Sequence, residues 1–244
     1  MADLLLGIPS KGRMHEEAAK WLAAAGMPLD RGAKMRGYVA RLHGTPGIEV
    51  HLLSAGEIAG ALDDGKLHVG LTGFDLLHER AGGLGDRMRV IACLGFSRAR
   101  VVVAVPEAWI DVDSMSDLVD VAACFHAKTR SRLRVATKFR HLTRRFFAGY
   151  GLFDYRIVPS LGATEGAPGA GAAELIVDIT ETGSTLAANQ LRILDDGVIL
   201  ESEAVLVASS AAMWNSQEAE TLSSLMRRLG HPAEDNLLQE LLQK

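Results

Sequence analysis

The chain has 244 residues, of which 48% are hydrophobic and 23% charged, and its formal net charge at pH 7 is −4. This length and apolar content allow one large domain or two small ones with a sizeable core, and they exclude a disordered chain. The weak acidic balance gives no bulk attraction to nucleic acids or to membrane surfaces. We therefore expect a soluble globular protein with neither of these as a partner.

Cysteine and histidine usage argues against a metal centre built from protein side chains. Cys93 and Cys124 lie far apart in apolar surroundings, which is typical of small buried residues in a reducing compartment. The eight histidines are scattered singly, so we expect no transition-metal site. The N-terminus has no basic segment, and no stretch approaches the roughly 18 apolar residues of a membrane span. A cytoplasmic location is expected.

Strands and helices alternate along the first hundred residues. The spacing of apolar residues predicts, in chain order, a strand over 4–8, a helix over 14–25, strands over 38–42 and 48–53, a helix over 57–62, a strand over 68–71, a helix over 74–79, and strands over 89–94 and 101–105.

The alternation continues to the end of the chain. The expected elements are a helix over 114–127, a strand over 133–136, a helix over 142–150, strands over 155–158, 175–179, 198–200 and 204–208, and helices from about 216 and about 233. This order predicts an α/β protein with mostly parallel sheets. The Gly/Ala-rich segment 161–171 is either a flexible linker or a mobile loop over a ligand, and it carries Glu165.

The stretch 174–189 carries the strongest chemical signal. A short apolar run is followed by two acids, a turn of glycine and hydroxyl residues, and a helix-forming run. A glycine lets the backbone approach an anion closely, and hydroxyls and helix N-terminal N–H groups donate to it, while carboxylates accept from sugar hydroxyls. The alternative is an ordinary capped turn. The pattern favours a ribose phosphate site made by Asp178, Glu181, Thr182, Gly183, Ser184 and Thr185.

Two further strand ends in the first half have the same plan. Lys11, Gly12 and Arg13 follow the first strand, where α/β folds bind ligands, and the two cations suit phosphates. The alternative is a solvated turn. The other strand end is Thr72-Gly73-Phe74-Asp75. Asp75 either faces the same ligand-binding cleft as the Lys11–Arg13 turn, or it lies in the first turn of the following helix and interacts favourably with the helix dipole.

Residues 128–145 hold eight Lys or Arg and no acid. A nucleic-acid patch is one interpretation, but aromatic residues that stack bases are missing apart from Phe139. A pocket for anionic small substrates and a solvated or subunit-contact face are the others. We favour a mixture in which Lys138 lies near a ligand while Arg130 and Arg132 are solvated.

Taken together, these motifs resemble ATP phosphoribosyltransferase, and the resemblance spans nearly the whole chain. The motifs that carry it are Pro-Ser-Lys-Gly-Arg at 9–13, Gly-Leu-Thr-Gly-Phe-Asp at 70–75, Arg-Val-Ala-Thr-Lys at 134–138, and a long signature that begins at Glu165 and ends Thr-Gly-Ser-Thr-Leu at 182–186.

The resemblance implies a fold of two α/β lobes similar to type II periplasmic binding proteins, with the active site in the cleft between them. Lobe I would comprise 1–97 and 190–244, and lobe II would comprise 98–189 with the phosphoribosyl-binding loop. The length resembles the family's short form, without the C-terminal regulatory domain. Short forms are catalytic subunits, so we expect a homodimer within a hetero-oligomer that includes a regulatory subunit similar to histidyl-tRNA synthetase.

The implied reaction is the first step of histidine biosynthesis. The 5-phosphoribosyl group of 5-phosphoribosyl-1-pyrophosphate passes to N1 of ATP and pyrophosphate leaves, with Mg²⁺ held mainly by the substrate phosphates rather than by the protein. The implied catalytic residues are Lys11, Arg13, Arg36, Asp178 and Glu181.

The nucleotide or cleft side is assigned to Gly12, Ser54, Thr72, Gly73, Asp75, Lys138 and Glu165. The chain departs from the family at Ser54, where many members carry an arginine. A salvage-type phosphoribosyltransferase and a non-catalytic solute-binding protein with the same lobes are the alternatives; the first has adjacent paired acids, and the second needs an export signal.

Overall fold

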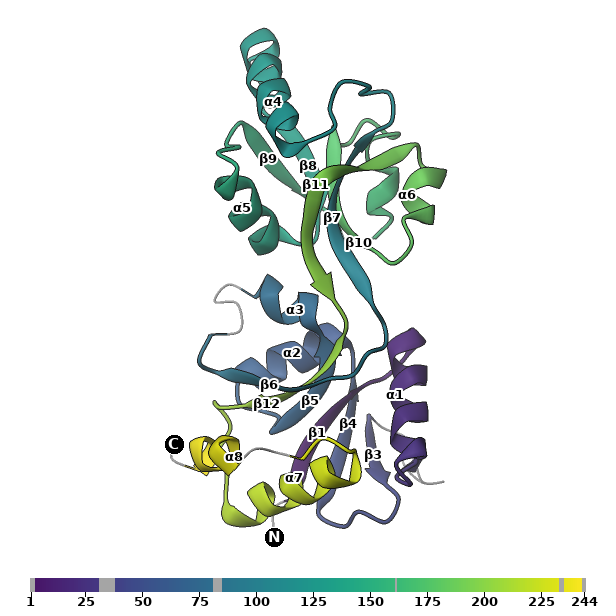
Figure 1. The fold of residues 1–244 in the computed structure, drawn as a ribbon, viewed down its shortest axis with the longest axis vertical. Helices are drawn as coiled ribbons and strands as arrows, with labels where there is room; N and C mark the ends of the chain where they lie inside the picture. The colour runs from purple at the N-terminus through teal and green to yellow at the C-terminus, as the bar shows by residue number, and fades with distance from the viewer. Residues whose placement is uncertain (1–2, 31–37, 81–84, 161, 233–234, 243–244) are drawn as a thin grey trace. The chain divides into compact units, whose positions relative to one another are not determined.

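The computed structural model describes residues 3–30, 38–80, 85–160, 162–232 and 235–242 (Figure 1). The chain forms two compact units, Met1–Ser97 with Glu203–Lys244, and Arg98–Ser202. The sequence-based division resumed the first lobe at about residue 190. The difference is the strand β11 (Leu191–Ser202), which pairs with a strand of the second unit and therefore belongs to that unit.

The first unit is built on a seven-stranded sheet in the order β2-β3-β4-β1-β5-β12-β6. Its strands are β1 Leu4–Pro9, β2 Leu29–Asp30, β3 Val39–Leu42, β4 Ile48–Leu53, β5 Val69–Gly73, β6 Met88–Cys93 and β12 Ala204–Ser209. Its helices are α1 Gly12–Ala24, α2 Ala55–Asp63, α3 Phe74–Glu79, α7 Ser216–Arg228 and α8 Asp235–Leu242. The sequence predicted each of these elements except β2.

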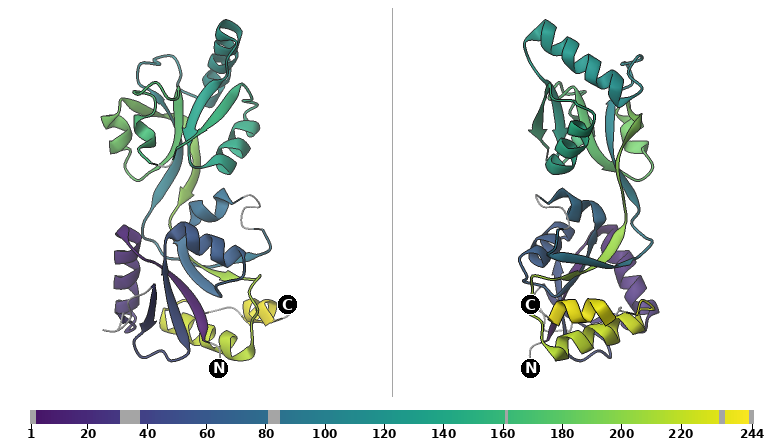
Figure 2. Two further views of the ribbon diagram at one scale, coloured as in Figure 1. Left: turned by 180° about the vertical axis from the view of Figure 1, so that it is seen from behind. Right: turned by 60° about the vertical axis from the view of Figure 1, so that its left-hand side comes forward.

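Helices cover both faces of this sheet, as the views in Figure 2 show. Successive side chains of a strand point to opposite faces. In β12, Leu206 and Ala208 pack in the cluster that includes buried residues of α1 and α7. Val205 and Val207, which alternate with them, pack in the cluster that includes buried residues of α2 and α3. The apolar run of β12 is therefore explained by burial on both faces.

The second unit has a five-stranded sheet in the order β11-β7-β10-β8-β9. Its other strands are β7 Ala99–Pro106, β8 Leu133–Thr137, β9 Tyr155–Pro159 and β10 Leu175–Thr180. Its helices are α4 Met115–Thr129, α5 Arg140–Gly149 and α6 Ser184–Ala188, with the 3₁₀ turn η1 at Thr164–Gly166. Alternation along β7 again serves two faces: Val101 and Val103 pack with α4 and α5, whereas Val102 and Ala104 pack on the side of α6.

The expectation of mostly parallel sheets is wrong, because both sheets are mixed. Parallel pairing joins β1 to β4 and β5, and joins β8 to β9 and β10. The other described pairings are antiparallel. The chain enters the second unit through β7 and leaves it through β11, and these two strands run in opposite directions side by side. Local apolar spacing gives no information on such long-range pairing.

The expectation of buried cysteines is also wrong, since Cys93 and Cys124 are both exposed. Cys93 ends β6, which is an edge strand of the first sheet. Cys124 lies off the buried face of α4, which is formed by Met115, Leu118 and Ala122. Among the described helices, none has both the length and the apolar character needed to cross a membrane.

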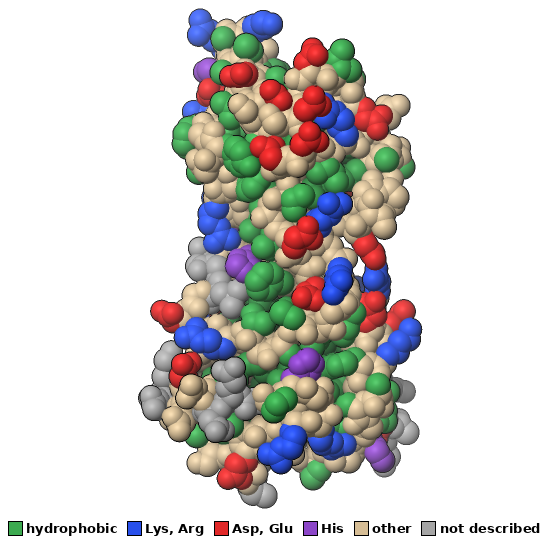
Figure 3. Space-filling view, viewed as in Figure 1, with side chains coloured by type: hydrophobic (Ala, Val, Ile, Leu, Met, Phe, Trp, Pro, Cys, Tyr) green, Lys and Arg blue, Asp and Glu red, His purple; other side chains and the backbone are tan. Residues whose placement is uncertain are grey.

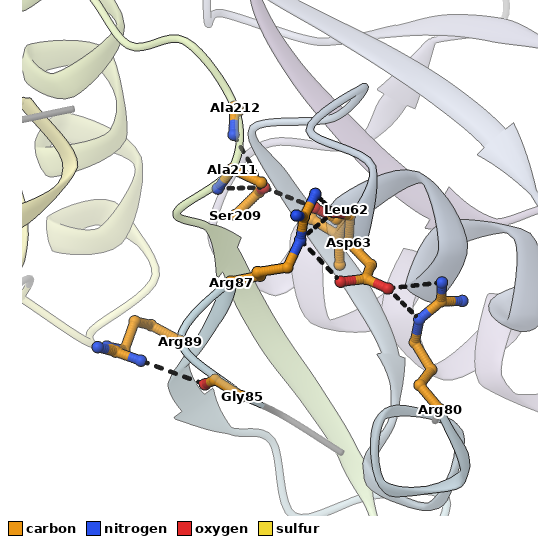
Figure 4. A network of polar contacts seen from close by, with 9 residues as sticks. All are labelled: Leu62, Asp63, Arg80, Gly85, Arg87, Arg89, Ser209, Ala211 and Ala212. Carbon is orange, nitrogen blue, oxygen red and sulfur yellow. Dashed lines mark hydrogen bonds and ion pairs between the residues drawn. The ribbon is translucent and has the colours of Figure 1, made fainter. Parts of the chain in front are cut away.

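A network of polar contacts joins α2 to its neighbours in the first unit (Figure 4). Asp63, at the end of α2, accepts hydrogen bonds from the Nε atom of Arg80 at 2.7 Å. The guanidinium of Arg87 lies 3.2 Å from the other carboxylate oxygen of Asp63 and donates to its backbone oxygen at 2.8 Å. Ser209 of β12 donates to the backbone oxygen of Leu62 at 2.6 Å. These contacts hold the C-terminal end of α2, whose N-terminal end follows β4.

Candidate functional site

Three neighbouring parallel strands of the first unit end at one edge of their sheet. The order β4-β1-β5 places the carboxyl end of β1 between those of β4 and β5. Pro9 is in register with Leu53, and the backbone N–H of Ser10 donates to the backbone oxygen of Leu53 at 2.8 Å. This edge carries the turns that follow the three strands and includes Lys11, Gly12, Arg13, Ser54, Thr72, Gly73 and Asp75. Carboxyl ends of parallel strands are where α/β sheets bind ligands.

The Lys11–Arg13 turn presents its cations outward. Lys11 is the extended N-cap residue of α1, and Gly12 has a φ of +78°, a conformation that favours glycine. Both are exposed. Arg13 donates from Nε to Glu17 at 3.1 Å, one helical turn on, and the other oxygen of Glu17 accepts from the Ser97 hydroxyl. The Ser97 hydrogen bond and the Arg13 cation lower the pKa of Glu17, although its slight burial opposes them.

Ser54 has a structural role that we did not predict, although the sequence carries a signal for it. Its hydroxyl accepts from the Glu57 N–H at 3.3 Å, and its own N–H donates to the Glu57 carboxylate at 2.8 Å. This reciprocal capping box begins α2. The hydrogen bonds of Ser54 lower the pKa of Glu57, and the positive charge of Lys11 adds to this effect. The pattern Ser-x-x-Glu before an apolar helix was the signal that predicts this cap.

The Thr72–Asp75 turn points inward. Thr72 is fully buried, and its hydroxyl donates to the backbone oxygen of Ala55 at 2.8 Å, so it joins the end of β5 to the start of α2. Gly73 is the N-cap of α3, and a Cβ atom there would collide with the carboxylate of Asp75. Asp75 itself is buried in the first turn of α3. This turn therefore holds the edge together, whereas the Lys11–Arg13 turn exposes charge.

The second unit has a cavity of about 360 Å³ at the carboxyl end of β10. It is lined by Glu165, Asp178, Ile179, Thr180, Glu181, Thr182, Ser184, Thr185 and Leu186. The structure thus brings Glu165, 13 residues before Asp178 in the sequence, to the same cavity as the strand-end turn. Of the two interpretations of segment 161–171, this contact supports a loop at a ligand site.

The turn after β10 has its backbone arranged around Gly183. Gly183 has a φ of +79° and precedes the short helix α6. Its N–H donates to the hydroxyl of Thr180 at 2.9 Å, and Thr182 donates its hydroxyl proton to Ser184 at 2.9 Å. The Ser184 N–H lies 3.3 Å from the Thr182 hydroxyl. Thr182, Ser184 and Thr185 are exposed, so three residues with hydroxyl groups lie together at the surface of this cavity. Thr180, the last residue of β10, was not predicted to belong to this site.

Asp178 has a perturbed environment. It is half-buried, and its carboxylate accepts from the Ile179 N–H at 2.8 Å. Burial raises the pKa of Asp178, the Ile179 hydrogen bond and the Lys138 cation oppose this effect, and the neighbouring charge of Glu165 adds to it. Lys138 follows β8, the parallel neighbour of β10, and its Nζ atom lies 5.0 Å from the centre of the Phe139 ring. A perturbed carboxylate in a cavity marks a candidate functional site.

The structure therefore gathers the candidate residues into two clusters, one in each unit. The cluster of the second unit contains Lys138, Glu165 and the strand-end turn. Glu181 lines the cavity and is exposed. Arg36 lies outside the described residues. In the part of the chain that the structure describes, no three His, Cys, Asp or Glu side chains form a group able to hold a metal ion.

The chain is similar to proteins of one family. The family model described as ATP phosphoribosyltransferase matches residues 54–231. An ATP phosphoribosyltransferase of Caulobacter vibrioides is 53% identical over 223 residues, which cover 91% of this chain and 70% of that protein. An ATP phosphoribosyltransferase of Bradyrhizobium diazoefficiens is 50% identical over 240 residues, covering 98% of this chain and 74% of that protein.

Solved structures agree with this similarity. The ATP phosphoribosyl transferase (HisG:HisZ) complex from Thermotoga maritima contains a chain that is 26% identical and superposes with a TM-score of 0.69, covering 98% of both chains. A substrate-binding protein of an amino acid ABC transporter superposes with a TM-score of 0.51 at 11% identity, covering 99% of this chain and 97% of that chain. The latter shows that the two-lobed fold is shared with binding proteins.

Proposed function

The chain belongs to the ATP phosphoribosyltransferase family, and from this premise we propose that it transfers the 5-phosphoribosyl group of 5-phosphoribosyl-1-pyrophosphate to N1 of ATP, releasing pyrophosphate. This is the first step of histidine biosynthesis. The single observation that supports the site assignment is the cavity at the end of β10, which combines carboxylates with a turn of hydroxyl and amide donors.

We assign the 5-phosphoribosyl group to this cavity. The hydroxyl groups of Thr182, Ser184 and Thr185 suit a phosphate, since all three residues are exposed at the cavity and Gly183 has no Cβ atom to keep an anion away from the backbone. Asp178 and Glu181 accept from the ribose hydroxyls. Their negative charge also stabilises the positive charge that develops at C1 as the leaving group departs.

The cluster of the first unit is assigned to the pyrophosphate. Lys11 and Arg13 are its exposed cations, and Arg36 is the third candidate. Ser54 carries no charge and caps α2, so the cations of the Lys11–Arg13 turn act in place of the arginine that many family members carry there. Mg²⁺ prefers oxygen ligands and keeps several waters, which the substrate phosphates accommodate. We therefore treat Mg²⁺ as entering with its substrate.

The proposed chemistry needs no protein nucleophile. The lone pair of adenine N1 forms the new bond to C1 while the C1–oxygen bond breaks and its electrons leave with pyrophosphate, with inversion at C1. The residues contribute by holding two substrates in line, which alone supplies roughly 7–11 kcal/mol. Lys138, Glu165 and Asp75 are assigned to the nucleotide side and the rim of the site.

We also propose that the chain assembles with a regulatory partner. The Thermotoga maritima structure with which it superposes is a HisG:HisZ complex. The proposed assembly contains a homodimer of this chain and a subunit similar to histidyl-tRNA synthetase.

An ultraviolet assay tests the activity. The protein is mixed with ATP, 5-phosphoribosyl-1-pyrophosphate and Mg²⁺, with and without the regulatory partner, and product absorbance is followed. Product should form with ATP and should not form with free purine or pyrimidine bases. Transfer to a free base instead of ATP would identify a salvage-type enzyme, and binding without turnover in both arms would leave only a solute-binding role. Near-normal transfer by Asp178→Ala would overturn the ribose assignment.

A further inference from the structure

The second unit has another cavity, which lies at the edge of its sheet opposite the cavity at the end of β10. Its volume is about 570 Å³, and it is lined by Phe125, Thr129, Ser131, Arg132, Arg134, Arg156 and Glu174. Arg134 and Arg156 lie near the amino ends of the parallel strands β8 and β9. The candidate catalytic turn follows the carboxyl end of β10, which is parallel to β8. The two cavities are therefore separate sites on one sheet.

Charges lie side by side across the strands at this edge. Arg134 of β8 is in register with Arg156 of β9. On the other side, the Glu174 N–H donates to the backbone oxygen of Arg134 at 3.0 Å, so Glu174 occupies the adjacent position. Like charges at facing positions of neighbouring strands are destabilising. One acid next to two bases leaves this row with a net positive charge.

Glu174 holds Arg134 in a fixed orientation. Its carboxylate accepts from the Arg134 Nε atom at 3.0 Å and from Nη2 at 2.5 Å, and it also accepts from the backbone N–H of Arg134. Although partial burial acts to raise the pKa of Glu174, these hydrogen bonds outweigh it and lower the pKa. The acid therefore remains ionised and acts as an anchor for the guanidinium.

Three guanidinium groups keep donors available to a ligand. Nη1 of Arg134 has no partner among the residues that the structure describes. Within the same described ranges, neither Arg132 nor Arg156 forms an ion pair or a hydrogen bond through its side chain. The forked donors of arginine match the oxygens of phosphate in pairs. Further Lys and Arg side chains lie over the end of α4 (Figure 3), outside the lining of this cavity.

We propose that this cavity binds a small phosphorylated molecule, held by Arg132, Arg134 and Arg156. Its volume falls within the range of about 300–1,000 Å³ typical of small-molecule sites. Phe125 offers an apolar surface against which the organic part of a phosphate ester packs. A nucleic acid is disfavoured, because the net charge of the chain is −4 and the cavity has one aromatic side chain rather than a series that stacks bases.

Titration calorimetry at constant ionic strength tests the proposal with inorganic phosphate and with phenyl phosphate as probes. The binding loop assigned to the 5-phosphate is first disabled by Thr182→Val and Ser184→Ala, and the turn assigned to pyrophosphate by Lys11→Gln and Arg13→Gln, so that the remaining binding reports on the second cavity. We expect phosphate to bind in this background. Arg132→Gln with Arg156→Gln should then weaken binding at least tenfold, and Ser131→Glu, which adds a carboxylate at the cavity, should do the same.

The matched control is Lys128→Gln with Arg130→Gln, which removes two exposed positive charges from the same segment without altering a lining residue. This control should bind like its parent. Tighter binding of phenyl phosphate identifies an organic phosphate as the ligand, and equal binding identifies free phosphate. Loss of all binding in the loop-disabled background, or equal weakening by the control pair, would overturn the proposal without touching the assignment of the catalytic loop.

Discussion

Arg13 donates from its Nε atom to the carboxylate of Glu17 at 3.1 Å. The second oxygen of Glu17 accepts from the hydroxyl of Ser97, the last residue before the chain enters the second unit, where the backbone has a φ of +52°. The Glu17 carboxylate therefore connects Arg13, a proposed pyrophosphate-binding cation, to Ser97, after which the chain enters the second unit. Glu17 acts through Arg13, so it is a positioning residue.

Glu17→Gln should raise the KM for 5-phosphoribosyl-1-pyrophosphate several-fold with a smaller change in kcat. The reason is that Arg13 loses its charged partner but remains present. The change in stability should stay below about 1 kcal/mol, because half of the Arg13 side chain is exposed and exposed ion pairs contribute little. Steady-state kinetics and thermal melting measure both quantities. Glu16→Gln, an exposed neighbour on the same helix, is the control and should change neither.

Asp178→Asn should reduce kcat/KM while raising the melting temperature. Each lost hydrogen bond between a carboxylate and a ribose hydroxyl costs about 1.5–3 kcal/mol, roughly a tenfold to 150-fold decrease. Because burial raises the folded-state pKa of Asp178 above its unfolded value, its ionisation costs stability as pH rises through that pKa. Asparagine removes this cost at neutral pH and keeps an acceptor for the Ile179 N–H. A gain of up to about 2–4 °C is expected, and a marked decrease would contradict the burial argument.

The candidate site of the second unit could largely be predicted from sequence because its determinants are local. A buried strand, two acids and a glycine turn follow one another in the sequence, so the end of the strand brings their side chains to one place. Glu165 joins them across 13 residues, and the Gly/Ala-rich segment alone left a flexible linker and a loop over a ligand as alternatives. The Arg13–Glu17 pair has helical spacing, whereas the Ser97 contact to Glu17 spans 80 residues and depends on tertiary structure.

The same limit explains the errors. Apolar spacing placed the strands of both sheets except β2, but nothing local distinguishes β7 and β11 as an antiparallel pair, so the sheets were expected to be mostly parallel. Local sequence also does not indicate that the Thr72 hydroxyl donates to the backbone oxygen of Ala55, 17 residues away; the assignment of Thr72 to the nucleotide or cleft side stays a prediction. Cys93 has apolar neighbours in sequence but lies on an edge strand, and is therefore exposed.

Lys138→Met should move the acidic limb of the kcat/KM profile to higher pH. The Lys138 cation lowers the pKa of Asp178 against the effect of burial, so its removal raises that pKa further. Asp178 is proposed to act as the ionised form, and activity is lost as pH falls through its pKa, so the loss should begin at a higher pH in the variant. Lys128→Met removes an exposed charge from the same segment and should leave the limb in place. An unshifted limb in Lys138→Met would show that Lys138 does not lower the pKa of Asp178.

Gly183→Ala should destabilise the chain through the backbone rather than through a clash. A Cβ atom at Gly183 would meet only the Ile193 side chain, at 3.9 Å, but its φ of +79° costs a residue with a side chain about 1–2 kcal/mol. A decrease of about 2–8 °C in melting temperature is therefore expected. Gly166→Ala is the matched control beside Glu165, because Gly166 has no positive φ and open space around it. Equal effects of both substitutions would refute the role of the left-handed backbone in the turn.

Ser54→Ala distinguishes a role of Ser54 as the cap of α2 from a role in contacting substrate. Loss of the capping hydroxyl should cost about 0.5–2 kcal/mol, because the Glu57 N–H loses its acceptor. Ser114→Ala removes the same hydroxyl from the capping box that begins α4 and provides the matched reference for a purely structural cap. Equal losses of stability are expected, measured by urea unfolding. If Ser54 also lies at the nucleotide, the KM for ATP rises in Ser54→Ala alone; an unchanged KM in both variants would restrict Ser54 to its cap and leave the Lys11–Arg13 turn as the binding element of that edge.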